Sequence, residues 1–187
     1  MGFDLTGDLL ISTPAMGDPR FEHSVIFLCA HNAEGAFGLV LNRPVKGLTM
    51  AEVLEQIGIE DCGVLGSAPV MMGGPVDSQR GFVLHGGSAE DDPSGQAIPG
   101  GLVLSASTDI LRSIGQGNGP QDWLLVLGYS GWGPGQLEAE ISQNAWLTCA
   151  APRELVFDPS PGAHQWSDAL RSMGIDPRSL SAVAGRA

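Results

Sequence analysis

Four glycines and a proline fall within residues 128–135, and this cluster restricts the fold more than any other feature of the chain. The continuous apolar run 123–127 precedes it, and the amphipathic segment 136–147 follows it. Glycine loses more conformational entropy on folding than any other residue, so such a cluster costs stability unless its geometry is needed. The pattern predicts a buried strand, a glycine-rich loop and a helix start, where backbone N–H groups can point at a ligand.

Short elements separated by turns are predicted for the rest of the chain, which has 27 glycines and 13 prolines among 187 residues. The segments 24–30 and 36–41 form an expected hairpin, and 70–72 is expected to pair antiparallel with 81–85. Further strands are expected at 9–12, 102–105 and 154–157. Because hairpins dominate and helices interrupt the strands irregularly, the chain is predicted to be one α+β domain spanning residues 1–187.

Helices are predicted from their capping residues. Thr49 and Glu52 form a capping box that opens a helix through Gln56. A second helix is expected at 108–114, with Asp109 in its first turn, where a negative charge is favourable. Ser160 and Pro161 are predicted as the N-cap and first residue of a helix near 164–173, and the tail 179–187 has a weak helical pattern.

The charge balance restricts the choice of partner. The chain has 21 acidic and 9 basic residues, a formal net charge of −12, and Lys46 is its only lysine. A protein that binds nucleic acid through its phosphates needs a basic face, which so few cations cannot supply. Direct nucleic-acid binding is therefore not expected.

Cysteine usage and hydropathy indicate a cytoplasmic protein. Cys29, Cys62 and Cys149 are widely spaced and form no C-x-x-C motif, so neither a disulfide framework nor a zinc site is predicted. The four histidines are scattered, and we expect no metal and no cofactor. The N-terminus lacks a basic signal-peptide region, and no apolar run reaches membrane-spanning length, so no membrane interaction is expected.

The common catalytic and nucleotide-binding motifs are incomplete. Ser130 lies in G-x-S-x-x, but Trp132 occupies the position where a nucleophile elbow needs glycine. The second glycine-rich turn, 73–81, contains Arg80 but matches neither the P-loop nor G-x-G-x-x-G. Glu138 and Glu140 are two residues apart, which puts them on nearly opposite faces of a helix. No catalytic residue is therefore assigned.

Several blocks of the chain, taken in order, resemble one known family. They are 9–21, 24–31 (SVIFLCAH), 38–44 (GLVLNRP), 73–76 with 80–85, and 128–140, and the likeness continues to 184–187. This pattern is similar to that of the AlgH/YqgE family. The resemblance implies a bacterial cytosolic protein with an α+β fold of coiled, branching, barrel-like sheets and a few helices. It implies no established activity and no agreed catalytic residues. The family name comes from a proposed role in regulating the transcription of alginate synthesis.

Three functions follow from these observations. We favour a non-enzymatic binding or regulatory module for an unknown protein or small molecule. The alternative is an enzyme of unknown class that uses His85, Glu138 or Glu140 as acid–base groups in a cleft near the 128–140 glycine loop. The third is the DNA-binding regulator that the family name suggests, although no helix-turn-helix is apparent. The predicted binding cleft is bordered by Asn42, Arg43, Gly73, Gly74, Pro75, Arg80, Gly131, Trp132, Gln136, Glu138 and Glu140.

Overall fold

The computed structural model describes residues 3–60 and 62–180. Its ten strands join in one sheet. They are β1 (Asp8–Ser12), β2 (Val25–Asn32), β3 (Gly35–Val40), β4 (Pro44–Thr49), β5 (Pro69–Met72), β6 (Val76–Gly86), β7 (Gln96–Ile98), β8 (Leu102–Ser105), β9 (Trp123–Trp132) and β10 (Trp146–Ala150). The helices are α1 (Met50–Gln56), α2 (Thr108–Gly115), α3 (Gln136–Ser142), α4 (Arg153–Val156) and α5 (His164–Ser172), and 3-10 turns occur at Pro19–Phe21, Gly63–Ser67 and Pro177–Ser179.

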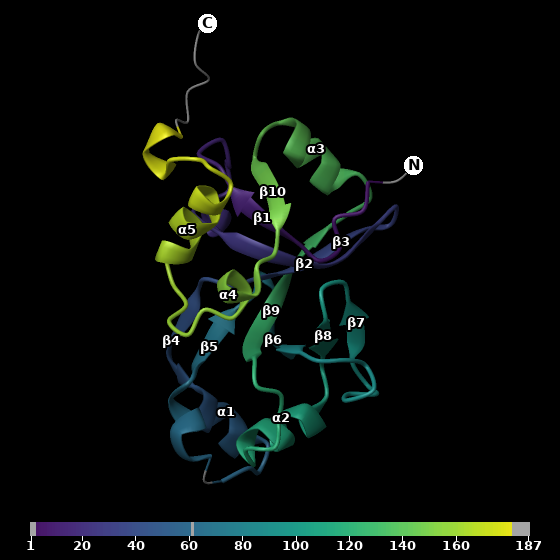
Figure 1. The fold of residues 1–187 in the computed structure, drawn as a ribbon, viewed down its shortest axis with the longest axis vertical. Helices are drawn as coiled ribbons and strands as arrows, with labels where there is room; N and C mark the ends of the chain where they lie inside the picture. The colour runs from purple at the N-terminus through teal and green to yellow at the C-terminus, as the bar shows by residue number, and fades with distance from the viewer. Residues whose placement is uncertain (1–2, 61, 181–187) are drawn as a thin grey trace, which may run out of the picture.

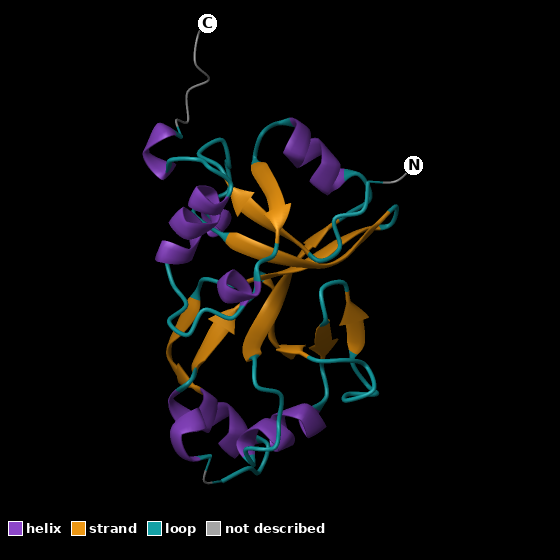
Figure 2. Cartoon of the chain, viewed as in Figure 1, coloured by secondary structure: helices purple, strands orange, loops and turns teal. Residues whose placement is uncertain are grey.

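The sheet has two halves that share one long strand, β9 (Figures 1 and 2). The main path runs β10-β1-β2-β3-β9-β6-β8-β7, and β5 branches from β9 and carries β4. In the upper half α3 and α5 flank the sheet, whereas α1 and α2 lie beneath the lower half. All pairings are antiparallel except that of β5 with β9. The predicted α+β class and the branching implied by the family resemblance are confirmed.

Strand β9 gains β3 as a partner beyond Gly128. Before it, Leu125 pairs with Val83 of β6 and with Val70 of β5; after it, Ser130 pairs with Gly38 of β3. Gly128 has φ +70°, a conformation that glycine adopts without a steric penalty. The predicted loop at 128–135 is therefore wrong in its first half. The chain bends at Gly128 but remains a strand through Trp132, because β3 offers it a second ladder.

The second glycine pair, Gly73 and Gly74, lies against this bend. A Cβ on Gly73 would lie 2.4 Å from the Gly128 carbonyl oxygen, and one on Gly74 would lie 2.2 Å from the Tyr129 carbonyl. The Gly73 N–H donates to the Leu127 carbonyl (2.8 Å), and the Gly73 carbonyl accepts from the Val40 N–H (2.9 Å). These glycines allow three chain segments to cross at close approach.

Three apolar clusters stabilise the sheet, and one of them extends across both halves. In the lower half, Leu54 of α1 and Ile114 of α2 bury against Val70, Val83 and Leu125. In the upper half, Leu137 of α3 packs on one face, and Trp166 and Leu170 of α5 pack on the other. The helices are therefore held by their apolar stripes, as expected for amphipathic segments.

Several predicted elements are confirmed. The hairpin of β2 and β3 forms, and so does the Thr49–Glu52 capping box, in which both side chains reach the opposite backbone N–H groups. Helix α2 starts after Ser107, with Asp109 in its first turn. The helix near 164–173 exists, but Ala163 occupies its N-cap position, so the prediction for Ser160 and Pro161 is wrong.

Other local predictions are wrong for reasons that lie outside the segments concerned. Strand β5 pairs with β4 and β9 instead of with residues 81–85. The amphipathic segment 136–147 stays helical only to Ser142, because Trp146–Ala150 joins the edge of β1 as β10. The expected strand at 154–157 is helix α4. The predicted tail helix falls largely on 181–187, and the similarity at 184–187 falls wholly there, outside the described residues.

Candidate functional site

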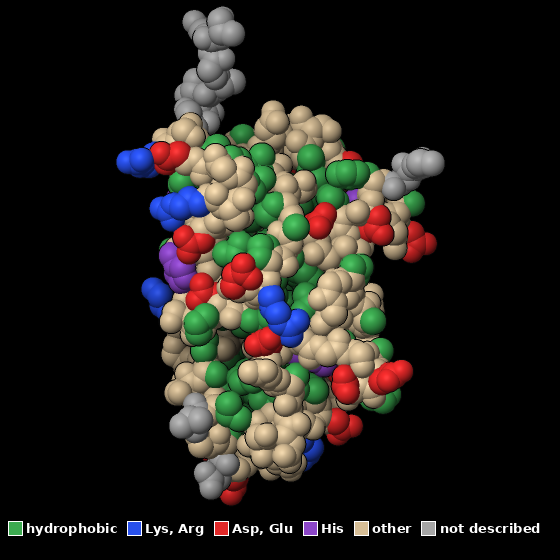
Figure 3. All heavy atoms as spheres, viewed as in Figure 1, with side chains coloured by type: hydrophobic (Ala, Val, Ile, Leu, Met, Phe, Trp, Pro, Cys, Tyr) green, Lys and Arg blue, Asp and Glu red, His purple; other side chains and the backbone are tan. Residues whose placement is uncertain are grey.

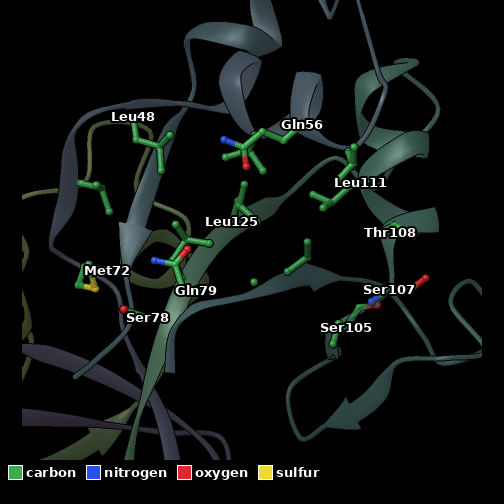
Figure 4. A pocket seen from close by; sticks show the side chains of 17 residues that line it. Leu48, Gln56, Met72, Ser78, Gln79, Ser105, Ser107, Thr108, Leu111 and Leu125 are labelled. Atoms are coloured by element: carbon green, nitrogen blue, oxygen red, sulfur yellow. The ribbon is translucent and has the colours of Figure 1, made fainter. Parts of the chain in front are cut away.

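A cavity of about 470 Å³ lies on the lower half of the sheet, between α1 with β4 on one side and the start of α2 on the other (Figure 4). Its floor is formed by β5, β9 and β6. The lining contains no ionisable side chain, although the chain carries 30 acidic and basic residues in total. It consists of Val45, Leu48, Val53, Gln56, Ile57, Met72, Ser78, Gln79, Gly81, Val83, Ser105, Ala106, Ser107, Thr108, Leu111, Leu125 and Leu127.

Two amide side chains interrupt the apolar lining. In Figure 4 the amides of Gln56 and Gln79 lie on either side of Leu125. Within residues 3–60 and 62–180, neither amide has a hydrogen-bond partner. Each amide offers one acceptor and two donor hydrogens. The cavity thus combines apolar walls with a few free polar groups, as small-molecule sites do.

A large bulge in β6 builds one wall of the cavity. Val76 pairs with Tyr129 and Gly81 pairs with Leu127, so the four residues between them on β6 oppose the single residue Gly128 on β9. The intervening residues leave the ladder, and Asp77 adopts φ +48°. Bulges re-aim side chains and occur often beside active sites. Here the bulge brings Ser78 and Gln79 onto the cavity wall.

A second cavity, of about 340 Å³, adjoins the first. The two share Met72 and Ser78 in their linings, so they are neighbours beside the bulge. Unlike the larger cavity, the smaller one carries charged groups, from two arginines. Its lining is Arg20, Phe21, Val40, Arg43, Met72, Gly74, Pro75 and Ser78.

Three of the sequence-predicted site residues, Arg43, Gly74 and Pro75, meet in this smaller cavity. Gly73 lies buried at the strand crossing, and its backbone is used there. Asn42 is buried too; its Oδ1 accepts from the Val25 N–H (3.0 Å) and its Nδ2 donates to the His23 carbonyl (2.9 Å).

Arg80 belongs to the projecting bulge and lines neither cavity. Its guanidinium carbon lies 5.1 Å from the centre of the Phe82 ring, a cation–π contact on the sheet surface. The side chain is exposed. The structure therefore separates Arg80 from Arg43, although the sequence groups them at one cleft.

The remaining predicted residues gather in the upper half around α3. Glu140 Oε2 accepts from the indole nitrogens of Trp132 (2.9 Å) and Trp146 (2.8 Å), and Gln136 Nε2 donates to Glu140 Oε1 (2.9 Å). This network holds α3 against the sheet. Gly131 is an exposed position on β9 that pairs with Phe37. These residues line neither of the two cavities described above.

Glu138 makes a separate contact on α3. His31 Nδ1 accepts from the Leu5 N–H (3.2 Å), so the ring proton is on Nε2, which donates to Glu138 Oε1 (3.1 Å). The helix backbone and then His31 lower the pKa of Glu138. His31 is almost fully buried and fastens the N-terminal segment to the sheet.

His85, the third acid–base candidate, lies in the lower half on β6. Its Nε2 is 3.3 Å from Asp92 Oδ2, and its Nδ1 is 3.0 Å from the Gly86 carbonyl. Burial raises the pKa of Asp92, but hydrogen bonds from Ser105, Ser94 and His85 together hold it below its usual value. His85 and the two glutamates therefore have different partners in different halves and form no common acid–base set.

The comparisons with known proteins agree with this architecture. A family model described as AlgH-like matches residues 9–178. The chain belongs to the AlgH-like family. It is 49% identical to a UPF0301 protein of Cereibacter sphaeroides strain ATCC 17029, covering 98% of this chain and 100% of the relative. It is 50% identical to a UPF0301 protein of Ruegeria pomeroyi, with the same coverage.

Two solved structures share the AlgH-like fold. The solution structure of AlgH from Pseudomonas aeruginosa has a TM-score of 0.76 at 43% identity, covering 100% of this chain and 98% of that one. A crystal structure of a Corynebacterium diphtheriae protein has a TM-score of 0.73 at 22% identity, covering 91% and 88%, which supports the fold alone. The family resemblance predicted from the sequence blocks is confirmed.

The sequence reasoning missed the larger cavity of this AlgH-like chain. Nothing in the sequence marks Gln56 and Gln79 as binding residues, because isolated glutamines are ordinary surface residues. One signal was present: residues 77–80 are polar next to the apolar run 82–84, so they do not continue a buried strand pattern. Such a break in the strand pattern is compatible with a bulge, but it does not identify the cavity that the bulge borders.

Ser130, rejected above as a nucleophile, has a structural partner. Its buried hydroxyl donates to the Gly73 carbonyl (3.1 Å) at the strand crossing. Ser130→Ala is expected to lower the free energy of unfolding by about 1 kcal/mol, since Gly73 keeps its bond from Val40. Urea unfolding measures this change. A loss of ligand binding in a fully folded Ser130→Ala variant would contradict a purely structural role.

Two further features bear on chemistry and location. Across residues 3–60 and 62–180, no three His, Cys, Asp or Glu side chains gather as a metal site requires. None of the helices in this part of the chain is both long and apolar enough to cross a membrane.

Proposed function

We propose that this AlgH-like protein is a binding module that takes the uncharged, apolar part of a small ligand into the larger cavity. The absence of ionisable side chains from that lining, in a chain with a net charge of −12, is the observation that carries the proposal. A volume of about 470 Å³ is within the range of small-molecule sites. Gln56 and Gln79 would orient the ligand through hydrogen bonds.

The module would be cytoplasmic and would act through its ligand or a protein partner instead of through DNA. On the face shown in Figure 3, acidic side chains lie among the basic ones, so this face offers no continuous basic patch for phosphates. The cysteines Cys29, Cys62 and Cys149 are free, which suits a reducing compartment. Any regulatory role would then follow from ligand occupancy.

Gly81→Val tests the location of the site. Gly81 lies on the cavity floor, and a Cβ there meets only Leu127 Cδ2, at 3.7 Å. Valine therefore enters the cavity without displacing backbone. We expect the substitution to weaken binding of neutral apolar fragments by about tenfold or more while leaving the fold intact. Chemical-shift titration with uncharged amide and alcohol fragments measures the loss, and thermal unfolding checks the fold.

Two matched valine variants serve as comparisons. Gly17→Val adds the same side chain at a position with no neighbour within 4 Å and should leave binding unchanged. Gly131→Val adds it on the upper half of β9, within the region the sequence suggested. If Gly131→Val abolishes fragment binding and Gly81→Val does not, the site is at α3 and the proposal is wrong. Fragment binding that survives both substitutions also contradicts it.

A further inference from the structure

The two arginines of the smaller cavity differ in how their charge is balanced. Arg20 pairs with Asp18 through Nη2 and Oδ2 at 2.6 Å. Arg43 donates instead to two backbone carbonyls, from Nη1 to that of Arg20 and from Nη2 to that of Glu22 (2.7 Å). Among residues 3–60 and 62–180, no carboxylate oxygen contacts the Arg43 guanidinium. Neutral groups hold it in place, and its positive charge is not paired.

Partial burial makes this unpaired charge costly. Burial lowers the pKa of Arg43, and the more distant carboxylates of Glu22 and Asp18 compensate only in part. A bound anion would remove the penalty, and because Arg43 is already oriented, little entropy would be lost on binding. Since Arg43 is the one arginine of this cavity without an ion pair, a singly charged anion matches it better than a dianion.

The position of Arg43 connects this charge to the larger cavity. Met72 and Ser78 line both cavities, so the two cavities are neighbours. Building on the proposed function, we propose that the ligand is a small free aliphatic carboxylate. Its chain lies in the uncharged larger cavity and its carboxylate pairs with Arg43 in the smaller one. Recognition then uses apolar burial at one end and a charge-assisted hydrogen bond at the other.

Octanoate and octanamide test this assignment, since they differ only in the charged end. Heteronuclear NMR titration of the full chain is expected to show octanoate binding about tenfold more tightly than octanamide. Arg43→Gln is expected to reduce this ratio to about one, mainly by weakening the binding of octanoate. Thermal unfolding checks that the variant is folded, and octanamide binding that Gly81→Val still weakens shows that the larger cavity is intact. Arg112→Gln, which removes an exposed charge on α2 outside both cavities, should preserve the ratio.

The outcomes separate the two proposals. Equal affinities for octanoate and octanamide, or a ratio that Arg43→Gln leaves unchanged, overturn the carboxylate assignment. Octanamide binding that remains sensitive to Gly81→Val would still uphold the proposed function in that case. Failure of both compounds to bind overturns both proposals. Acetyl-Ala-Val-Leu with a free carboxylate is the third probe, and tighter binding than octanoate would assign the site to a peptide C-terminus and overturn the free-acid proposal.

Discussion

Asp92→Asn is expected to lower the free energy of unfolding by about 1–3 kcal/mol, because it removes a buried carboxylate on which several hydrogen bonds converge. His85 and Asp92 are 1% and 6% exposed. The Gly86 carbonyl and the Asp92 carboxylate contact the two ring nitrogens of His85. Asparagine replaces one carboxylate oxygen with an amide nitrogen, so it disturbs the hydrogen bonds that Asp92 makes with His85 and Ser94. Urea unfolding at pH 7 measures the loss.

The dependence on pH identifies the source of this stability. The pKa of Asp92 is lower in the folded chain than its ordinary value. The contribution of Asp92 to the free energy of unfolding is therefore present above its pKa in the unfolded chain, about 3.9. It is lost as the pH falls through the pKa of Asp92 in the folded chain. The difference between wild type and Asp92→Asn should shrink below about pH 4. Asp91→Asn removes the neighbouring exposed carboxylate and should cost far less; equal losses for the two variants would refute the buried pair.

Gly74→Ala is expected to destabilise the protein by about 2–6 kcal/mol, combining backbone strain with overpacking. Gly74 has φ +156°, which residues with a Cβ rarely adopt, and its Cβ would lie 2.2 Å from both the carbonyl carbon and the oxygen of Tyr129. Since these are backbone atoms at the junction of β5 and β9, they cannot move away without disturbing the crossing. Thermal and urea unfolding measure the loss.

Gly101→Ala separates the destabilisation due to backbone strain from that due to overpacking. Gly101 also has a positive φ, +73°, but no atom lies within 4 Å of the position that its Cβ would take. This variant should therefore show strain alone, about 1–2 kcal/mol. If Gly74→Ala costs no more than Gly101→Ala, close approach at the crossing does not constrain the fold.

Elements with a local signal could be predicted from the sequence. The Thr49–Glu52 capping box identified the start of α1, and the two β-rich runs around a glycine turn identified the hairpin of β2 and β3. Both are stabilised mainly by neighbours along the chain. The pairing of β5 with β9 could not be predicted, because it joins Val70 to Leu125 and depends on where distant strands lie.

The candidate site was predicted in part for the same reason. Arg43, Gly74 and Pro75 were identified from their motifs, and the structure brings them to one cavity. Trp132 and Glu140 were grouped with them because glycine-rich turns suggested a shared binding edge, yet they form a network that holds α3. Gln56 and Gln79, on α1 and the β6 bulge, were missed because no spacing rule relates them.

The sequence by itself determined the α+β class, the net charge of −12, and the family, through residues 9–140 read in order. The tertiary structure alone decided what the glycines do. In the sequence the cluster at 128–135 looked like a loop for a ligand; in the fold Gly128 bends a continuous strand, and Gly73 and Gly74 give it room. Glycine permits both arrangements equally, so only the segment packed against it distinguishes a ligand-binding loop from a strand crossing.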